Sequence, residues 1–299
     1  SRSVTWWPQA KAFLDYLARG SFLLQRGRFV ADVLYYYGDG GMNFVGPRKN
    51  PSGLGTGYDY DVTNAEVILR RLSVRDRRLT TPEGVSYAVL ALPDREDIHP
   101  PVLEKIEALV RAGASVVGRR PTRATGLEDF PASDARVREI AARLWGDLDG
   151  TTRTSRRHGA GRVFSGVPER AVLTELGVKP DFTAPATLDF IHRSDAEGEI
   201  YFVRNRTAAP VSATVTLRDG GSRGAVELWD PMRGTMRAAR GARPTATGTE
   251  VPLELAAQDA VFVMFRAAGT SGAASVAEAA RPAGGAKPPP LSLNDGWTV

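Results

Sequence analysis

The chain has 299 residues, of which 42% are hydrophobic and 24% charged, a composition typical of folded domains rather than disordered chains. Cysteine is absent, which excludes disulfides, thiolate zinc sites and every mechanism that uses a cysteine nucleophile. The net charge is +5, but the 39 basic residues are interleaved with the 34 acidic ones, whereas nucleic-acid binders usually concentrate theirs. No apolar run approaches the length of a membrane span. We therefore expect neither a nucleic-acid nor a membrane partner.

The first predicted element is a helix from Trp6 to Arg26, which Gly27 can end. Its apolar residues recur at spacings compatible with one face, but they cannot form a core alone, so the helix must pack on something else. The chain starts at Ser1 without a methionine or a signal peptide, and residues 294–299 have the pattern of the beginning of a strand. We therefore expect these residues to be part of a longer chain.

Residues 28–180 predict an α/β domain with a parallel sheet of the flavodoxin or amidotransferase kind, because strand and helix patterns alternate along them. A Gly-rich loop follows the first strand and runs to about Asp61. The expected strands are 29–37, 87–92, 114–118 and 161–165, and the expected helices begin at Asn64, Pro100 and Asp134. Helices should cover both faces of the sheet.

Residues 181–266 predict an antiparallel β-sandwich, because short strand patterns follow one another with turns between them and no helix pattern intervenes. The expected strands are 188–192, 199–205, 211–217, 225–229, 249–255 and 260–266. Residues 267–290 are rich in Ala, Gly, Ser and Pro, which indicates a linker. Residues 291–299 are expected to begin a further β-domain.

Two activities common in parallel-sheet domains are not supported. The loop from Gly38 to Asn43 has neither the G-x-G-x-x-G pattern nor a Walker-type motif, which argues against dinucleotide binding. Amidotransferase chemistry needs a cysteine nucleophile, so the absence of cysteine excludes it. The densest basic cluster is interpreted as a solvated helix end rather than a phosphate-binding patch; it comprises Arg70, Arg71, Arg75, Arg77 and Arg78.

The most conspicuous polar and aromatic cluster consists of Tyr58, Asp59, Tyr60 and Asp61. Carboxylates can bind sugar hydroxyls and aromatic rings can stack on a sugar, so one interpretation is a loop that contacts a sugar or an ion. The alternative is structural, with Asp61 or Thr63 capping the next helix. An EF-hand is excluded because Arg70 stands where its last glutamate would be.

Trp6, Trp7 and His192 are the remaining candidate binding residues. The two tryptophans precede a helix and form either a sugar-stacking platform or packing anchors. His192 ends a predicted strand and either reaches a neighbouring site or makes a structural hydrogen bond. The three histidines lie far apart, so neither a Ser/His/Asp set nor a metal site is predicted in this chain. Spacing singles out no pair of carboxylates for glycoside hydrolysis either, and the catalytic residues stay unknown.

Several segments, in the same order, resemble glycoside hydrolase family 106, whose members are α-L-rhamnosidases and their relatives. The matching segments are Val4-Thr5-Trp6-Trp7, Asp15-Tyr16-Leu17-Ala18-Arg19, Ser21-Phe22-Leu23-Leu24-Gln25, Val30-Ala31-Asp32-Val33-Leu34-Tyr35, Gly57-Tyr58-Asp59-Tyr60-Asp61, Ile200-Tyr201-Phe202-Val203-Arg204-Asn205 and Glu227-Leu228-Trp229-Asp230-Pro231. The resemblance covers nearly the whole chain up to Arg266.

The resemblance implies a large secreted or periplasmic enzyme with a (β/α)8 catalytic barrel, an amidotransferase-like domain without amidotransferase activity, and β-sandwich domains. It also implies two catalytic glutamates and a calcium ion in the barrel, of which residues 1–27 would be the last element. This chain would then be a non-catalytic, C-terminal-side part of an enzyme acting on terminal rhamnosides, with no cofactor of its own. The alternatives are a carbohydrate-binding or scaffolding module without hydrolase activity, and a related glycosidase of different specificity.

Overall fold

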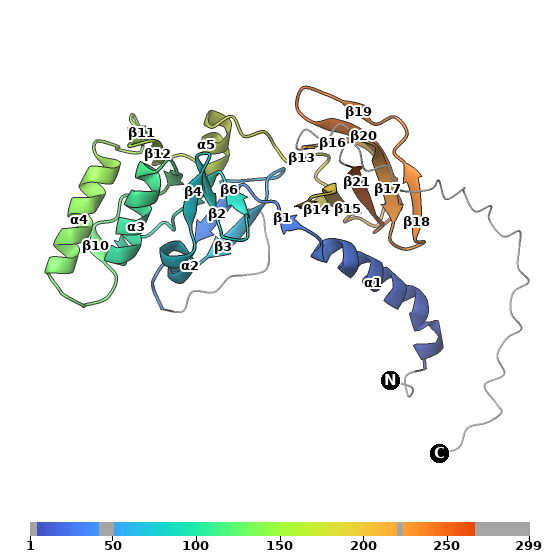
Figure 1. The fold of residues 1–299 in the computed structure, drawn as a ribbon, viewed down its shortest axis with the longest axis horizontal. Coiled ribbons are helices and arrows are strands. Elements are labelled where there is room, and N and C mark those ends of the chain that lie inside the picture. Colours follow the sequence, from blue (N-terminus) through green and yellow to red (C-terminus); the bar gives the residue numbers. More distant parts are fainter. Residues whose placement is uncertain (1–4, 42–50, 220–223, 267–299) are drawn as a thin grey trace, which may run out of the picture.

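The computed structural model describes residues 5–41, 51–219 and 224–266, which form two units on separate sheets (Figure 1). The expected linker at 267–290, the expected β-domain start at 291–299 and residues 42–50 of the long loop lie outside these described residues. Among the described residues, no helix is both long enough and apolar enough to cross a membrane.

A six-stranded sheet forms the centre of the first unit, in the order β11-β12-β9-β7-β2-β3, and every neighbouring pair except β11–β12 is parallel. The five parallel strands therefore follow the order 2-1-3-4-5, which is that of flavodoxin-like sheets. The strands are β2 (Val33–Tyr36), β3 (Tyr60–Thr63), β7 (Val89–Ala91), β9 (Ser115–Val117), β11 (Ser155–His158) and β12 (Gly161–Phe164).

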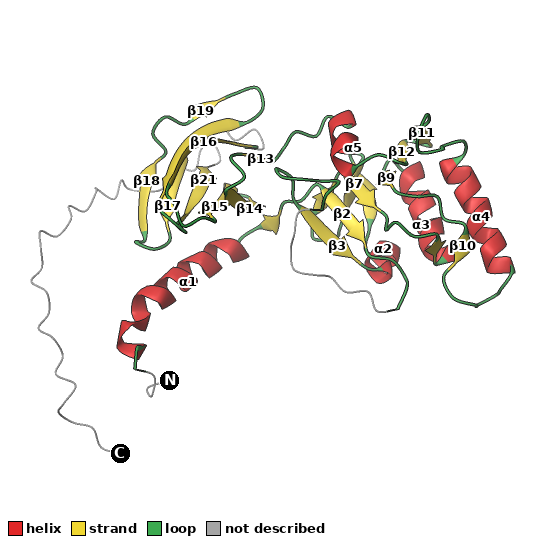
Figure 2. Cartoon of the chain, turned by 180° about the vertical axis from the view of Figure 1, so that it is seen from behind, coloured by secondary structure: helices red, strands yellow, loops and turns green. Residues whose placement is uncertain are grey.

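Helices cover both faces of this sheet because its strands are apolar on both sides. Leu34 and Tyr36 of β2 face one core, and Val33 faces the other. The first face is covered by α2 (Ala65–Arg70), α3 (Pro100–Arg111) and α4 (Ala132–Trp145), and the second by α5 (Glu169–Glu175) (Figure 2). The helix expected to begin with Asp134 as its cap begins at Ala132 instead: Pro131 occupies the cap position, and the Asp134 carboxylate accepts a hydrogen bond from the Ala124 amide.

The second unit consists of two antiparallel sheets around one hydrophobic core, to which Tyr201 and Val263 contribute from one sheet and Val215 and Val251 from the other. The six-stranded sheet has the order β1-β14-β15-β21-β17-β18, with β1 (Arg28–Phe29), β14 (Leu188–Asp195), β15 (Gly198–Asn205), β21 (Ala260–Arg266), β17 (Val226–Asp230) and β18 (Thr235–Ala238). The four-stranded sheet has the order β13-β16-β20-β19, with β13 (Phe182–Thr183), β16 (Val211–Leu217), β20 (Thr249–Leu255) and β19 (Arg243–Pro244).

The predicted N-terminal helix is present as a 3-10 turn, η1 (Trp7–Gln9), followed by α1 (Ala10–Gln25). It lies along the second unit (Figures 1 and 2). Leu23 packs against Ile200, Phe262 and Met264, which alternate with the core residues of β15 and β21 and therefore face outward from the two-sheet core. The contact with α1 thus covers the outer face of the larger sheet.

The strand expected at 29–37 is in fact two strands in different units. β1 pairs with β14 of the second unit, whereas β2 lies in the parallel sheet of the first. Between them the backbone of Asp32 bonds to Asp59 and Ala88, so the chain leaves one sheet and enters the other within a few residues. The short segment between β1 and β2 therefore connects the two units directly.

The arginine cluster is also placed differently from the expectation. Arg70 and Arg71 end α2, but Arg75 and Arg78 lie in a hairpin whose turn residues Asp76 and Arg77 have φ of 51° and 61°. Positive φ at both turn residues matches the twist of a tight hairpin. The hairpin strands are β4 (Ser73–Arg75), β5 (Arg78–Thr80) and β6 (Ser86–Tyr87), and the short parallel pair β8 (Asp97–Ile98) and β10 (Arg123–Ala124) completes the unit.

Candidate functional site

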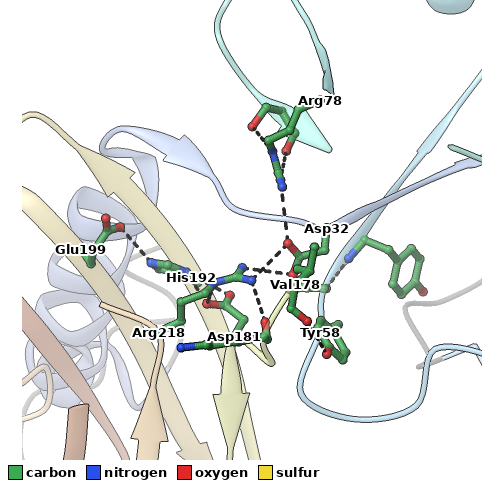
Figure 3. Close-up of polar contacts among 12 residues, drawn as sticks. Asp32, Tyr58, Arg78, Val178, Asp181, His192, Glu199 and Arg218 are labelled. Carbon is green, nitrogen blue, oxygen red and sulfur yellow. Dashed lines mark hydrogen bonds and ion pairs between the residues drawn. The ribbon is translucent and has the colours of Figure 1, made fainter. Parts of the chain in front are cut away.

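A buried group of charged side chains centred on His192 lies where the two units meet (Figure 3). His192 Nδ1 is 2.9 Å from both carboxylate oxygens of Asp181, and Nε2 is 2.9 Å from Oε2 of Glu199. The Tyr201 hydroxyl donates to Asp181 Oδ1 at 2.6 Å, and its ring stacks on the imidazole at a centroid distance of 3.8 Å. His192 is 3% exposed and Asp181 is 1% exposed. A carboxylate thus faces each nitrogen of a buried imidazole.

Arg218 connects this group to the first unit. Its Nη1 and Nη2 donate to the two carboxylate oxygens of Asp32 at 3.2 and 3.0 Å, while Nε lies 3.3 Å from Asp181 Oδ1. Asp32 lies between β1 and β2, where the chain crosses from one unit to the other. Arg78 approaches the same carboxylate at 3.8 Å from the hairpin of the first unit. Arg218 and Arg78 thus join the carboxylate of Asp32 to the group around His192, and the network includes side chains of both units (Figure 3).

The electrostatics favour the charged forms of the central pair. Burial by itself lowers the pKa of His192, but the Asp181 and Glu199 carboxylates outweigh it, so this pKa is raised. Burial would raise the pKa of Asp181, yet His192 and Arg218 outweigh burial and lower it. For Asp32 burial prevails over the attraction of Arg218, and its pKa is raised. The geometry is that of an imidazolium held between two carboxylates.

The carboxylates of the network are engaged by basic side chains: Asp181 and Glu199 by His192, and Asp32 by Arg218. Glu199 also lines a cavity. Among the described residues, no group of three or more His, Asp or Glu side chains is arranged to hold a metal ion. The side chain of His192 makes the hydrogen bonds of the structural interpretation, and it also lines a cavity of about 260 Å³.

Tyr58 and Asp59 are buried and engaged in the fold. The Tyr58 hydroxyl donates to the carbonyl of Val178 at 3.0 Å, and its ring lies 5.1 Å from the guanidinium of Arg170. Asp59 Oδ1 accepts the backbone N–H of Tyr60 at 2.9 Å. Both nevertheless line a cleft between the two units, as described below.

Tyr60 and Asp61 are not in a loop, because they begin the edge strand β3. The Tyr87 hydroxyl donates to Asp61 Oδ2 at 2.7 Å. Neither Asp61 nor Thr63 caps α2, because Asn64 is the cap and its side chain accepts from the Val67 amide. The four clustered residues of the sequence therefore divide between a cleft wall and a strand.

The cleft beside Tyr58 and Asp59 has a volume of about 540 Å³, within the range of small-molecule sites, which often lie between domains. Its far wall, on β14 and β15, carries Asp189 and Arg204, whose side chains are paired at 2.9 Å. Phe190 lies on the same wall. Paired carboxylate and guanidinium groups beside an aromatic ring can bind a polar ligand such as a sugar. The sequence could not predict that these residues face Tyr58, because they lie far from it along the chain.

Trp6 and Trp7 are not brought to this cleft. Trp7 begins the turn η1 and Trp6 precedes it, so both lie near the N-terminus, which is away from the junction of the units (Figure 1). They are 54% (Trp6) and 43% (Trp7) exposed. His192 lines a different cavity from Tyr58 and Asp59. The seven candidate residues therefore form no single site within this chain.

Comparison with known proteins gives consistent results. The sequence model of glycoside hydrolase family 106, described as α-L-rhamnosidase, matches residues 1–241. A putative β-glucuronidase of Formosa agariphila is 35% identical over 269 residues, which are 89% of this chain and 22% of that protein. A solved rhamnosidase of Novosphingobium sp. PP1Y is 32% identical with a TM-score of 0.77, over 91% of this chain and 26% of that one. A β-galactosidase of Bacillus circulans sp. alkalophilus, 13% identical with a TM-score of 0.50 over 84% of this chain and 44% of that one, shares the fold alone.

Replacing Arg218 by Met should destabilise the protein by about 3 kcal/mol, because it leaves Asp32 and Asp181 buried without their shared cation. Urea unfolding measures this change. The control is Arg204→Met, which breaks an exposed pair with Asp189 and should cost less than about 1 kcal/mol. An equal loss of unfolding free energy in the two variants would show that the buried network contributes no more stability than an exposed ion pair.

The stability of the protein should fall as the pH rises through the raised pKa of His192. Because that pKa lies above the ordinary value of 6.5, the contribution of the charged imidazole is complete below pH 6.5 and is lost at higher pH. Unfolding temperatures measured across pH 6 to 9 should show this decline, and His192→Gln should remove it. The control His99→Gln should retain it; a decline that persists in His192→Gln would assign it to another group.

Proposed function

We propose a function from the following premise: the chain belongs to glycoside hydrolase family 106, the family of α-L-rhamnosidases. The chain spans only 22% and 26% of the relatives described above, so the activity of a whole enzyme is part of the proposal. In this proposal the chain is a non-catalytic, C-terminal-side part of a hydrolase that removes terminal α-L-rhamnosyl groups.

The finer architecture follows the same proposal. Residues 28–180 are proposed as an amidotransferase-like domain that lacks a cysteine nucleophile, except that β1 at their start joins the sheet of the second unit. Residues 181–266 are proposed as a β-sandwich, and residues 1–27 as the end of a catalytic barrel. The strand order of the parallel sheet and the two facing antiparallel sheets support this division. The two catalytic glutamates and the calcium ion are assigned to the barrel, and the whole enzyme is proposed to be secreted or periplasmic.

The observation that carries the proposal is the uncovered apolar surface of α1. Phe13, Leu14 and Leu17 lie within about one turn of each other and are 56%, 45% and 43% exposed, and both tryptophans before the helix are exposed as well. Soluble proteins rarely leave so many large apolar side chains together in water. We propose that this surface packs against the barrel of the complete enzyme.

Two observations favour other functions. The cleft of about 540 Å³ between the units supports a carbohydrate-binding module that works without hydrolysis. The relative named as a putative β-glucuronidase supports a glycosidase of different specificity. Both alternatives keep a carbohydrate as the ligand.

The 299-residue chain alone should not hydrolyse an aryl α-L-rhamnoside, since no catalytic pair is assigned to it. Release of the aryl group is followed by absorbance, with the Novosphingobium rhamnosidase as the positive control. Hydrolysis by the purified chain would contradict the non-catalytic role. Calorimetric titration with rhamnose separates the alternatives, because measurable affinity in the inactive chain supports the binding module.

The apolar surface of α1 should make the isolated chain self-associate. In the variant Phe13→Ser/Leu14→Ser/Leu17→Ser, light scattering should give a smaller particle, while the unfolding temperature should stay nearly unchanged because these side chains are exposed. Leu127→Ser, which alters an exposed leucine of the first unit, is the control and should leave association unchanged. A monomeric parent chain with a destabilised triple variant would contradict the proposed docking surface.

A further inference from the structure

Arginines make up most of the charged lining residues of two cavities that share Arg78 as part of their walls. The smaller one, of about 260 Å³, lies at the junction of the units, and its charged lining residues are Arg28, Arg78, Arg218, His192 and Glu199. The larger one, of about 420 Å³, lies at the edge of the parallel sheet where β9 and β12 begin, and its charged lining residues are Asp76, Arg77, Arg78, Arg157, Arg162 and Glu175. Six arginines therefore face three carboxylates across the two cavities.

These arginines come together only in the fold. Arg28 is supplied by β1, and Arg77 and Arg78 by the β4–β5 hairpin. Arg157 and Arg162 face each other in register across the β11–β12 pair, and Arg218 follows β16. The turn beside the smaller cavity has a glycine, Gly84, with φ of 85°, and a Cβ there would collide with Nη1 of Arg28. The guanidinium of Arg28 therefore lies close against the backbone of this turn.

The carboxylates of the walls are already engaged by other groups. Glu199 pairs with His192 Nε2 at 2.9 Å, and Glu175 pairs with Nη2 of Arg162. The Nε of Arg162 is buried and has no hydrogen-bond partner in the part of the chain that the structure describes. The guanidinium of Arg162, a residue that lines the larger cavity, therefore has one N–H whose hydrogen bond is not made within the described part of the chain.

The positive charge of Arg78, the residue that lines both cavities, is only partly balanced by neighbouring carboxylates. Burial lowers the pKa of its guanidinium, and the neighbouring Arg218 acts in the same direction. Its nearest carboxylate, on Asp32, lies at 3.8 Å and is already held by both terminal nitrogens of Arg218. An anion in either cavity would relieve this excess of positive charge.

We propose that the two cavities form one binding groove for an acidic oligosaccharide, whose carboxylate or sulfate groups are bound by the arginines. Guanidinium groups match both oxyanions with paired N–H donors. A nucleic-acid strand fits less well, because single strands are usually held by bases stacking on aromatic side chains. Among the described residues that line the two cavities, Phe29 is the only Phe, Tyr or Trp. The saccharide part rests on the proposed function, whereas the anion part rests on the arginines.

Calorimetric titration of the 299-residue chain tests this groove with four probes of similar length: tetragalacturonate, a chondroitin sulfate tetrasaccharide, neutral cellotetraose and a thymidine tetranucleotide. We expect saturable binding of one or both acidic saccharides, weakening as salt is raised. Cellotetraose should not bind at this site. The acidic saccharide that binds more tightly identifies carboxylate or sulfate as the preferred group.

The variants Arg28→Gln and Arg157→Gln each remove one exposed guanidinium from one cavity and should weaken binding about tenfold, the usual effect of losing one charge-assisted hydrogen bond. The matched control Arg237→Gln removes another exposed arginine, on β18 and outside both cavities, and should bind as the parent chain does. Unchanged affinity in both cavity variants would overturn the groove.

A parallel titration with inorganic sulfate separates this proposal from the proposed function. Sulfate binding that is weakened by Arg28→Gln, together with binding of an acidic saccharide, supports the whole proposal. Sulfate binding without binding of either acidic saccharide would overturn the saccharide ligand and leave the anion site. Tighter binding of the tetranucleotide than of both saccharides would overturn the saccharide ligand as well. None of these results depends on whether the chain hydrolyses a rhamnoside.

Discussion

The ion pair between Asp32 and Arg218 is the contact on which the relation of the two units depends. A buried carboxylate without a cation is very costly, and Asp32 and Asp181 both lie almost entirely out of water. Arg218 serves both, and His192 completes the neutralisation of Asp181. Because Asp32 belongs to the first unit and the other three groups to the second, the orientation of the units is tied to charge pairing as well as to apolar packing.

The fixed junction also determines which surfaces the protein presents. The cleft of about 540 Å³ has one wall in each unit, and so does the smaller arginine-lined cavity, so both exist only while the units stay in place. The helix α1 extends away from this junction (Figure 1), and its apolar residues Phe13, Leu14 and Leu17 are exposed. The molecule thus combines a junction whose charged groups are paired with a helix whose apolar side chains are exposed.

Local patterns predicted most elements but not their partners. The strands β14, β15, β16 and β20 were predicted from alternating residues and short turns, since that alternation is imposed locally by a two-sheet core. The sequence predicts one strand from Phe29 to Tyr37, because this run is almost entirely apolar and contains no glycine or proline. The crossing between the sheets occurs at Asp32, the one charged residue of the run. The β4–β5 hairpin was missed because its turn is Asp76-Arg77, without the glycine or proline that usually signals one.

The sequence by itself determined the two kinds of sheet, the exclusion of amidotransferase chemistry by the absence of cysteine, and the family, because periodicity, composition and motif order are properties of the chain alone. It singled out His192 but could not choose between a ligand-binding and a structural histidine. Only the tertiary structure placed a carboxylate against each nitrogen of its imidazole and gathered the arginines around Arg78, because the groups that set the charge and burial of each side chain are remote along the chain: Arg218 stands 186 residues from Asp32. Electrostatic interactions act through space, so the role of a charged residue depends on neighbours that its own segment does not contain.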